Sequence, residues 1–165
     1  MRSKYCIVLF FYIFAFCKSN QKICEGENCR FGKHTVSYEN GDSFEGEFFE
    51  DTKHGFGIYR YSNGDIFEGE FKYGYKEGLG SYSYANGDRF LGNFEKGKRE
   101  GVGKYIFADG FILEGIWTNN ELTGKAKIVN AKGSLVLEGY WHQNSFIGIK
   151  PKEGLNDTIK ISNPE

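Results

Sequence analysis

The sequence contains few of the residues that stiffen or cross-link a chain, and it has almost no net charge. Its 165 residues include 2 prolines, 1 methionine and 4 cysteines, and the formal net charge is −1. A charge this close to zero gives no overall field that would attract nucleic acid, so no nucleic-acid partner is expected. No serine nucleophile elbow, phosphate-binding loop or paired zinc motif occurs. The sequence therefore predicts no enzyme activity, no metal, no cofactor and no small-molecule substrate.

Glycine and aromatic residues are abundant instead, and the glycines recur at a fixed interval. There are 23 glycines, 16 phenylalanines and 11 tyrosines, a mixture typical of short twisted strands joined by tight turns. Five glycines are spaced 23 residues apart: Gly41, Gly64, Gly87, Gly110 and Gly133. The residues around them recur as well, which indicates one small supersecondary unit copied in tandem and stable only when neighbouring units stack.

Each unit is predicted to be a β-hairpin. In the first strand of the first unit, Phe44, Gly46 and Phe48 alternate with polar residues, as in a half-buried strand. A polar turn and a second strand rich in aromatic residues follow. Dipeptides such as Asn63-Gly64 close each unit and favour type I′ turns, because both residues tolerate positive φ. Consecutive hairpins are therefore expected to join into one sheet.

The glycines inside the strands need a separate explanation, because glycine weakens a strand. Gly46, Gly69 and Gly92 each lie between two apolar positions. The missing side chain leaves a slot in which an aromatic ring of the adjacent strand can lie. The prediction is an elongated, single-layer antiparallel sheet in which rings over bare backbone replace an ordinary globular core.

The repeated unit resembles the MORN (membrane occupation and recognition nexus) repeat. The segments that carry the resemblance are Phe44-Glu45-Gly46-Glu47-Phe48 and Lys53-His54-Gly55-Phe56-Gly57-Ile58-Tyr59. Three units match closely, a fourth has Ala126 where the second glycine belongs, and a fifth ends after Gly148. The resemblance implies an all-β array of about five tandem MORN hairpins over residues 41–148. It also implies a non-enzymatic scaffold that acts near membranes through protein contacts and sometimes phospholipid.

The first 17 residues have the pattern of an export signal. Two basic residues precede the apolar run 6–17, which is too short to cross a bilayer as a stable helix. The segment Phe14-Ala15-Phe16-Cys17 resembles a bacterial lipobox, so lipidation of Cys17, cleavage near Ser19 and an uncleaved anchor all remain open. The expected locations are a membrane-anchored lipoprotein or a secreted or periplasmic protein. The rest of the chain is divided into a tether and N-terminal cap (18–40), the repeat array (41–148) and a C-terminal tail (149–165).

Two cysteines lie beyond this signal, Cys24 and Cys29. In an oxidising compartment, neighbouring cysteines at this spacing predict a disulfide, which would close the N-terminal cap. A metal site is the weaker alternative, because two thiolates without a nearby histidine fall short of the usual four ligands.

The repeating acidic residues imitate a catalytic or metal-binding cluster. Asp42, Asp65 and Asp88 recur because the turn recurs, and an aspartate after Asn-Gly is typical of a turn or strand start. His54 occupies the His-Gly position of the repeat and is assigned to a turn as well. We therefore expect these residues to be structural.

The sequence predicts a binding surface instead of an active site. One strand face carries tyrosine and phenylalanine at regular intervals, a larger apolar stripe than a soluble monomer normally exposes. The chain's own long side chains and tail residues 151–161 are expected to cover it, or else another copy, a partner protein or a ligand with repeating apolar faces. The candidate groove residues are Phe44, Tyr59, Phe67, Tyr82, Phe90 and Tyr105.

A phospholipid headgroup is the alternative ligand. Basic residues gather in the third unit, and the candidate anion-binding residues are Lys96, Lys98, Arg99 and Lys104. Binding of this kind would weaken in moderate salt, because salt screens the attraction between exposed charges.

Overall fold

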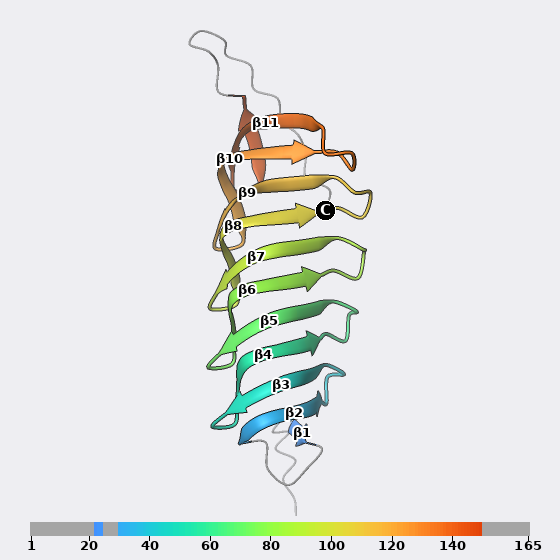
Figure 1. Cartoon of the computed structure of the whole chain (residues 1–165), viewed down its shortest axis with the longest axis vertical. Helices are drawn as coiled ribbons and strands as arrows, with labels where there is room; N and C mark the ends of the chain where they lie inside the picture. Colours follow the sequence, from blue (N-terminus) through green and yellow to red (C-terminus); the bar gives the residue numbers. More distant parts are fainter. Residues whose placement is uncertain (1–21, 25–29, 150–165) are drawn as a thin grey trace, which may run out of the picture.

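The computed structural model describes residues 22–24 and 30–149. They form one 12-stranded antiparallel sheet whose strands lie side by side in chain order. Figure 1 shows the strands as the rungs of an elongated ladder. Over the described ranges, no helix is long and apolar enough to cross a membrane. The predicted all-β, single-layer antiparallel sheet of tandem hairpins is confirmed.

The strands are short and similar in length. They are β1 (Lys22–Cys24), β2 (Phe31–Tyr38), β3 (Ser43–Phe49), β4 (Thr52–Arg60), β5 (Ile66–Lys72), β6 (Tyr75–Ser83), β7 (Arg89–Glu95), β8 (Lys98–Ile106), β9 (Ile112–Thr118), β10 (Glu121–Val129), β11 (Leu135–His142) and β12 (Ser145–Gly148). Each unit consists of an odd-numbered strand and the even-numbered strand that follows it, starting from β3.

The two strands of a unit are joined by a tight turn in left-handed backbone. Glu50 and Asp51 connect β3 to β4 with φ values of 47° and 62°, and Tyr73 and Gly74 connect β5 to β6 with 49° and 85°. Two successive left-handed residues define a type I′ turn, which matches the twist of the flanking strands. The equivalent turns are Lys96-Gly97, Asn119-Asn120 and Gln143-Asn144.

The connections between units use a different turn from the one predicted. At the Asn63-Gly64 connection only the glycine has a positive φ, 94°. The Gly64 N–H donates to Tyr61 O, and the Tyr61 N–H donates to Asp65 O, which is a type I turn closed by a glycine bulge. The prediction of a type I′ turn here was wrong, because the Asn63 side chain accepts a hydrogen bond from the Asp65 N–H across the turn.

One face of the sheet is buried by rings that lie over paired glycines. Gly46 of β3 is paired with Gly57 of β4, and a methyl group added at Gly57 would lie 2.4 Å from the Phe44 ring. The ring therefore occupies the space that two side chains would fill. Phe44, Phe67 and Phe90 hold equivalent positions and are all fully buried. We call this side of the sheet the aromatic face.

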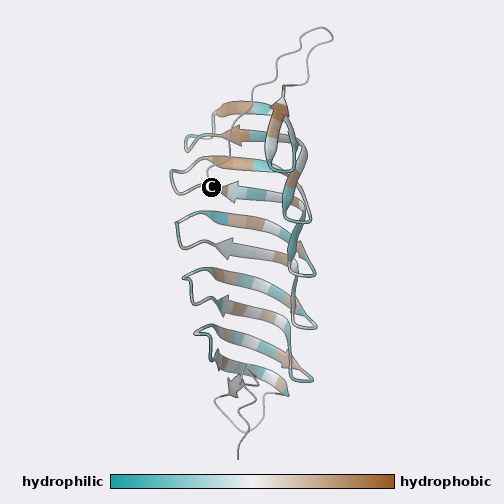
Figure 2. Cartoon of the chain, turned by 180° about the vertical axis from the view of Figure 1, so that it is seen from behind, coloured by the Kyte–Doolittle hydropathy of each residue, from teal (hydrophilic) through white to brown (hydrophobic). Residues whose placement is uncertain are grey.

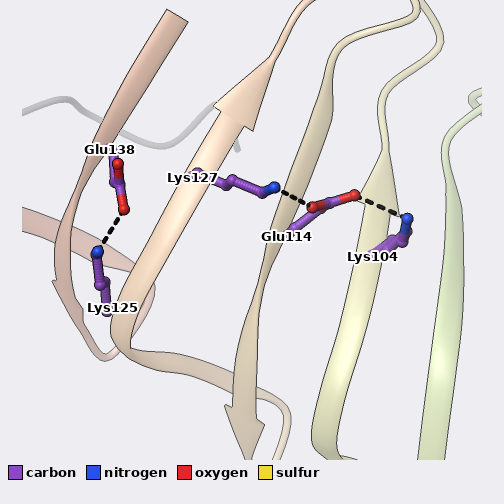
Figure 3. A network of polar contacts seen from close by, with 5 residues as sticks. All are labelled: Lys104, Glu114, Lys125, Lys127 and Glu138. Carbon is purple, nitrogen blue, oxygen red and sulfur yellow. Dashed lines mark ion pairs between the residues drawn. The ribbon is translucent and has the colours of Figure 1, made fainter. Parts of the chain in front are cut away.

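The opposite face is exposed and carries both charged side chains and large apolar ones such as Phe56, Leu79 and Val102. Hydrophobic and hydrophilic residues alternate along the strands (Figure 2), as expected when one face is covered and the other solvated. Near the C-terminal end, the Glu114 carboxylate binds Lys104 at 2.8 Å and Lys127 at 2.9 Å, and Lys125 pairs with Glu138 (Figure 3). These pairs cross four adjacent strands, β8 to β11, without contributing to the core.

Candidate binding face

Buried rings form a continuous row along the aromatic face. Within the first unit, Phe44 and Phe48 meet edge-to-face with ring centroids 5.3 Å apart, and Phe44 also contacts Phe71 of the next unit at 4.9 Å. The same two contacts recur in the next two units, and the row ends on Trp117. Edge-to-face pairs stabilise beyond their buried area, so this row joins the units into one core.

A second row of rings lies beside the first and is only half-buried. This tyrosine row consists of Tyr38, Tyr59, Tyr61, Tyr82, Tyr84, Tyr105 and Phe107. Neighbouring ring centroids are 4.5 to 5.9 Å apart. Because the rings are partly accessible, the row presents apolar surface from β2 to the end of β8.

The tyrosine row is held in place by aspartates from the turns between units. The Tyr59 hydroxyl donates to the Asp42 carboxylate at 2.7 Å, and the Ser62 main-chain N–H donates to the same carboxylate at 2.8 Å. Asp42 is buried, with 8% of its surface exposed. Asp65 and Asp88 accept the equivalent bonds from the next two units. We call each of these arrangements an aspartate staple; the assignment of these residues to structural roles agrees with this geometry.

The staples shift the pKa of their own groups. Burial alone would raise the pKa of the Asp42 carboxyl, but the hydrogen bonds from Ser62, Tyr59 and Asn40 outweigh it and hold the pKa below its ordinary value. Burial and the bond to Asp42 raise the pKa of the Tyr59 hydroxyl. The same balance lowers the pKa of the other two carboxyls, Asp65 and Asp88. Each staple is therefore ionised aspartate with neutral tyrosine at neutral pH.

A cation lies over the rings in each of the first three units. The Lys76 ammonium is 4.8 Å from the Tyr82 ring centroid and 5.3 Å from that of Phe67, and it donates to the Tyr61 hydroxyl at 3.2 Å. Burial lowers the pKa of Lys76 to about 8, with Asp65 opposing and Arg99 adding to the shift. Lys53 and Arg99 stand at the equivalent positions. The sequence interpretation missed Lys53 and Lys76, although their 23-residue spacing to Arg99 is visible in it.

The row of cations ends where the fourth unit begins, and a groove opens there. Leu122 takes the position of Lys53, Lys76 and Arg99, and Leu113 takes that of the buried phenylalanines. The groove has a volume of about 440 Å³. Residues lining it include Tyr84, Arg99, Leu113, Trp117, Leu122 and Trp141.

The structure separates the six predicted groove residues into two groups. Phe44, Phe67 and Phe90 have 0% exposure, so they support the face from beneath and do not offer a contact surface. Tyr59, Tyr82 and Tyr105 belong to the half-buried tyrosine row, and Tyr105 lines the groove. Sequence alternation could not distinguish the two groups, because both lie on the same side of the sheet.

The four basic residues predicted to bind an anion are not all brought together, although Lys96 and Lys98 line one hollow with Glu95 and Glu100. Arg99 lies on the aromatic face, opposite Phe94 in the strand pairing, whereas Lys104 lies on the opposite face and binds Glu114. Lys96 lies in the β7–β8 turn, and Lys98 donates to Asn119 Oδ1 at the same edge of the sheet. A common headgroup site built from all four is therefore not supported by this arrangement.

The cysteine predictions fall mainly outside the described residues. Cys17 and Cys29 lie outside those ranges, and Cys24 is the last residue of β1. The proposed disulfide and lipidation thus remain predictions. Among residues that the structure does describe, no group of three or more His, Cys, Asp or Glu side chains could hold a metal ion.

The comparisons with known proteins agree with the repeat. Residues 44–66, 67–89 and 90–111 match the MORN repeat model, so the chain contains three MORN repeats. No curated protein matched the chain.

Two solved structures are similar at low identity. The TCP domain of Drosophila melanogaster SAS-4, solved in complex with a proline-rich motif of Ana2, is 17% identical with a TM-score of 0.48, covering 79% of this chain and 70% of that one. The TCP10 domain of Danio rerio CPAP is 14% identical with a TM-score of 0.23, covering 67% and 68%. At these levels neither neighbour assigns a partner to this chain.

Proposed function

We propose that this chain is a non-enzymatic MORN-repeat binding or scaffold protein whose aromatic face binds an extended segment of a partner protein. The observation that carries the proposal is the tyrosine row, a half-buried line of rings that crosses three successive repeats beside a row of cations. Tyrosine and arginine are enriched at protein interfaces, whereas lysine is depleted, and rigidly held side chains lose little conformational entropy on binding. The aspartate staples supply that rigidity.

The spacing of the units suits an extended ligand. Neighbouring strands lie about 4.8 Å apart, so one hairpin advances the array by roughly 10 Å. An extended chain advances about 3.3 Å per residue, and every third residue of a segment lying along the array would therefore meet the next unit. Affinity would then be the sum of several weak, equally spaced contacts.

A peptide-display experiment tests this function. A library of random dodecapeptides is selected against the full chain, and the recovered peptides are measured against Tyr61→Ala and Leu79→Ala. Tyr61 belongs to the tyrosine row but to no aspartate staple, whereas Leu79 lies on the opposite face with 68% of its surface exposed. Weaker binding by Tyr61→Ala alone supports the proposal. Recovery of no binding peptide, or equal binding by the two variants, contradicts it.

We also propose that the protein acts outside the cytoplasm, at a membrane face if Cys17 is lipidated. The support is the sequence of residues 1–17, which has the pattern of an export signal. The chain would then continue with the tether and N-terminal cap (18–40), the repeat array (41–148) and the C-terminal tail (149–165). Mass spectrometry of the mature N-terminus is the test. An acylated Cys17 or a new N-terminus near Ser19 would support export, and an intact Met1 in the purified cellular protein would argue against a cleaved signal.

A further inference from the structure

We propose that the groove at Arg99 is an anchor site that takes an aspartate or glutamate flanked by a large apolar residue in the partner segment. This inference rests on the proposed function and specifies which part of the aromatic face selects the partner. It is argued from three observations: the change in residue types between the third and fourth units, the charge of Arg99, and the apolar residues beside Arg99.

The groove occurs where the third unit meets the fourth. In the earlier units a buried phenylalanine such as Phe67 covers the paired glycines, and a long cation such as Lys76 lies over that ring. At the fourth unit both are replaced by the shorter Leu122 and Leu113. The resulting hollow of about 440 Å³ is within the range of roughly 300–1,000 Å³ typical of ligand sites. A partner segment therefore meets a distinct position here in an otherwise repetitive face.

Arg99 supplies the positive charge and is held in a defined orientation. Its guanidinium lies over the Phe90 ring, 5.5 Å from the centroid. One terminal nitrogen donates to the Tyr84 hydroxyl at 3.3 Å and the other to the Asn120 carbonyl at 2.7 Å. A guanidinium has five N–H donors, so donors remain after these bonds. In the described part of the chain Arg99 makes no ion pair with a carboxylate.

Two other polar residues of the groove take part in hydrogen bonds. Asp88 accepts bonds from the Tyr105 hydroxyl and the Ala108 N–H. The Asn144 side-chain oxygen accepts one from the Leu122 N–H. Among the described residues that line the groove, Arg99 carries the one positive charge, and a planar carboxylate matches its fork of donors.

The rest of the lining selects an apolar neighbour for that carboxylate. Phe107 and Leu113 are the half-buried apolar residues of the lining, whereas Trp117, Leu122 and Trp141 are buried. A leucine or aromatic side chain of the partner would bury apolar area against Phe107 and Leu113, which is favourable. The acidic residue of the bound segment would lie at Arg99, where the third unit meets the fourth.

The test uses peptides recovered by the display selection on the full chain. Aspartate or glutamate beside a large apolar residue is expected to be enriched at one position. One such peptide and its Asp→Asn or Glu→Gln form are then titrated calorimetrically against the wild-type chain, Arg99→Leu and Arg99→Lys. Arg99→Leu introduces the residue that the next unit carries at this position, Leu122. Lys96→Gln is the matched control, because it removes one positive charge from the exposed turn.

The expected result is at least a tenfold loss of affinity for Arg99→Leu and for the neutral peptide, with no further loss when the two changes are combined. Arg99→Lys should retain part of the preference for the acidic peptide, and Lys96→Gln should bind as the wild type does. If Arg99→Leu fails to fold, the neutral peptide against the wild type and Arg99→Lys carry the test.

Other outcomes overturn the inference in ways that can be told apart. If no peptide binds at all, the proposed function fails as well. If peptides bind without acidic enrichment, or equally to Arg99→Leu, the anchor site is wrong while the function stands. Binding that appears only after removal of residues 150–165 would make the chain's own C-terminal segment the occupant. A dimer in sedimentation that Arg99→Leu dissolves would make it a second copy.

Discussion

The two ends of the array fill the same space with residues from different strands. In the three units between residues 44 and 111, a phenylalanine of the first strand covers the paired glycines, as Phe90 covers Gly92 and Gly103. In the later units the cover comes from the second strand: Leu122 lies over Gly115, and Phe146 lies over Gly139. The fold thus requires a filled volume above bare backbone, and the position that supplies the side chain can change.

The polar contacts change together with the core. In the first three units a turn aspartate binds a tyrosine 17 residues later, as Asp88 binds Tyr105. In the fourth unit these two positions are Phe111 and Ile128. An apolar pair thus replaces a polar one at both positions. The N-terminal units are therefore sensitive to pH and to ring size, and the C-terminal units are expected to be less so.

The largest expected effect on stability comes from giving Gly103 of the third unit the alanine side chain that the fourth unit carries at the equivalent position, Ala126. Gly103→Ala adds a methyl group 2.6 Å from the Phe90 ring, and this overpacking should cost about 3 kcal/mol. The fourth unit has Leu113 and Ala126 at the equivalent positions. Phe90→Leu combined with Gly103→Ala should therefore be more stable than Gly103→Ala alone. Urea unfolding of the three proteins measures this.

The reverse change is the control for that comparison. Ala126→Gly should cost only about 0.5–1 kcal/mol, because it adds backbone freedom and removes one methyl group. If Gly103→Ala and Ala126→Gly lose the same free energy of unfolding, the phenylalanine ring over the paired glycines does not distinguish the two ends of the array.

The second prediction concerns an aspartate staple. Asp65→Ala leaves the Ala85 N–H and the Tyr82 hydroxyl without their acceptor, and the expected loss is about 2 kcal/mol. The folded-state pKa of Asp65 is lowered, so its contribution is complete above the ordinary carboxyl pKa and disappears as the pH falls through the folded value. Thermal unfolding between pH 7 and pH 3 should show a shallower acid destabilisation for Asp65→Ala than for the wild type. Parallel curves would contradict the staple.

The third prediction concerns Lys76. Its folded-state pKa is lowered to about 8 from 10.5, so the charged ammonium disfavours folding below pH 8, and this penalty is relieved as the pH rises from 8 toward 10.5. Lys76→Leu, which copies Leu122, should raise stability at neutral pH by about 1 kcal/mol after allowance for partial exposure. It should also remove the rise in stability above pH 8. The free energy of unfolding of the wild type and of Lys76→Leu is measured at pH 7 and pH 9.5. If the variant shows the same rise in stability as the wild type, Lys76 is not the source of that rise.

The smallest expected effect is on the opposite face. Glu114→Gln breaks the contacts to Lys104 and Lys127, but exposed ion pairs contribute only about 0.2–1 kcal/mol. The difference from wild type should shrink further in 0.5 M salt, because salt screens exposed charges. A loss above 2 kcal/mol, or one that salt does not reduce, would show that this face contributes to the core energy.

The sequence predicted the fold well because the repeat makes each position visible several times. The alternation of Phe44, Gly46 and Phe48 and its two further copies specified both the strands and the covered face. It could not predict the turn at Asn63-Gly64, since a side-chain hydrogen bond decides between two turns with similar sequences.

The candidate site was harder to predict for a physical reason. Phe67 and Tyr82 lie on one face and differ only in depth, which depends on how neighbouring units pack. The groove at Arg99 lies where Leu113 and Leu122 of the fourth unit replace the phenylalanine and the long cation of the earlier units. Comparing Leu113 and Leu122 with their counterparts in earlier units is the signal that could have located it.

The short reach of the aspartate staples has a mechanical consequence. Each carboxylate binds groups 17 and 20 residues further along the chain, less than the length of one unit, so every bond closes a small loop. A molecule pulled from its two ends would yield one hairpin at a time, beginning at an open edge. Force–extension traces should accordingly show a series of small, similar steps of about 23 residues each in place of one abrupt rupture.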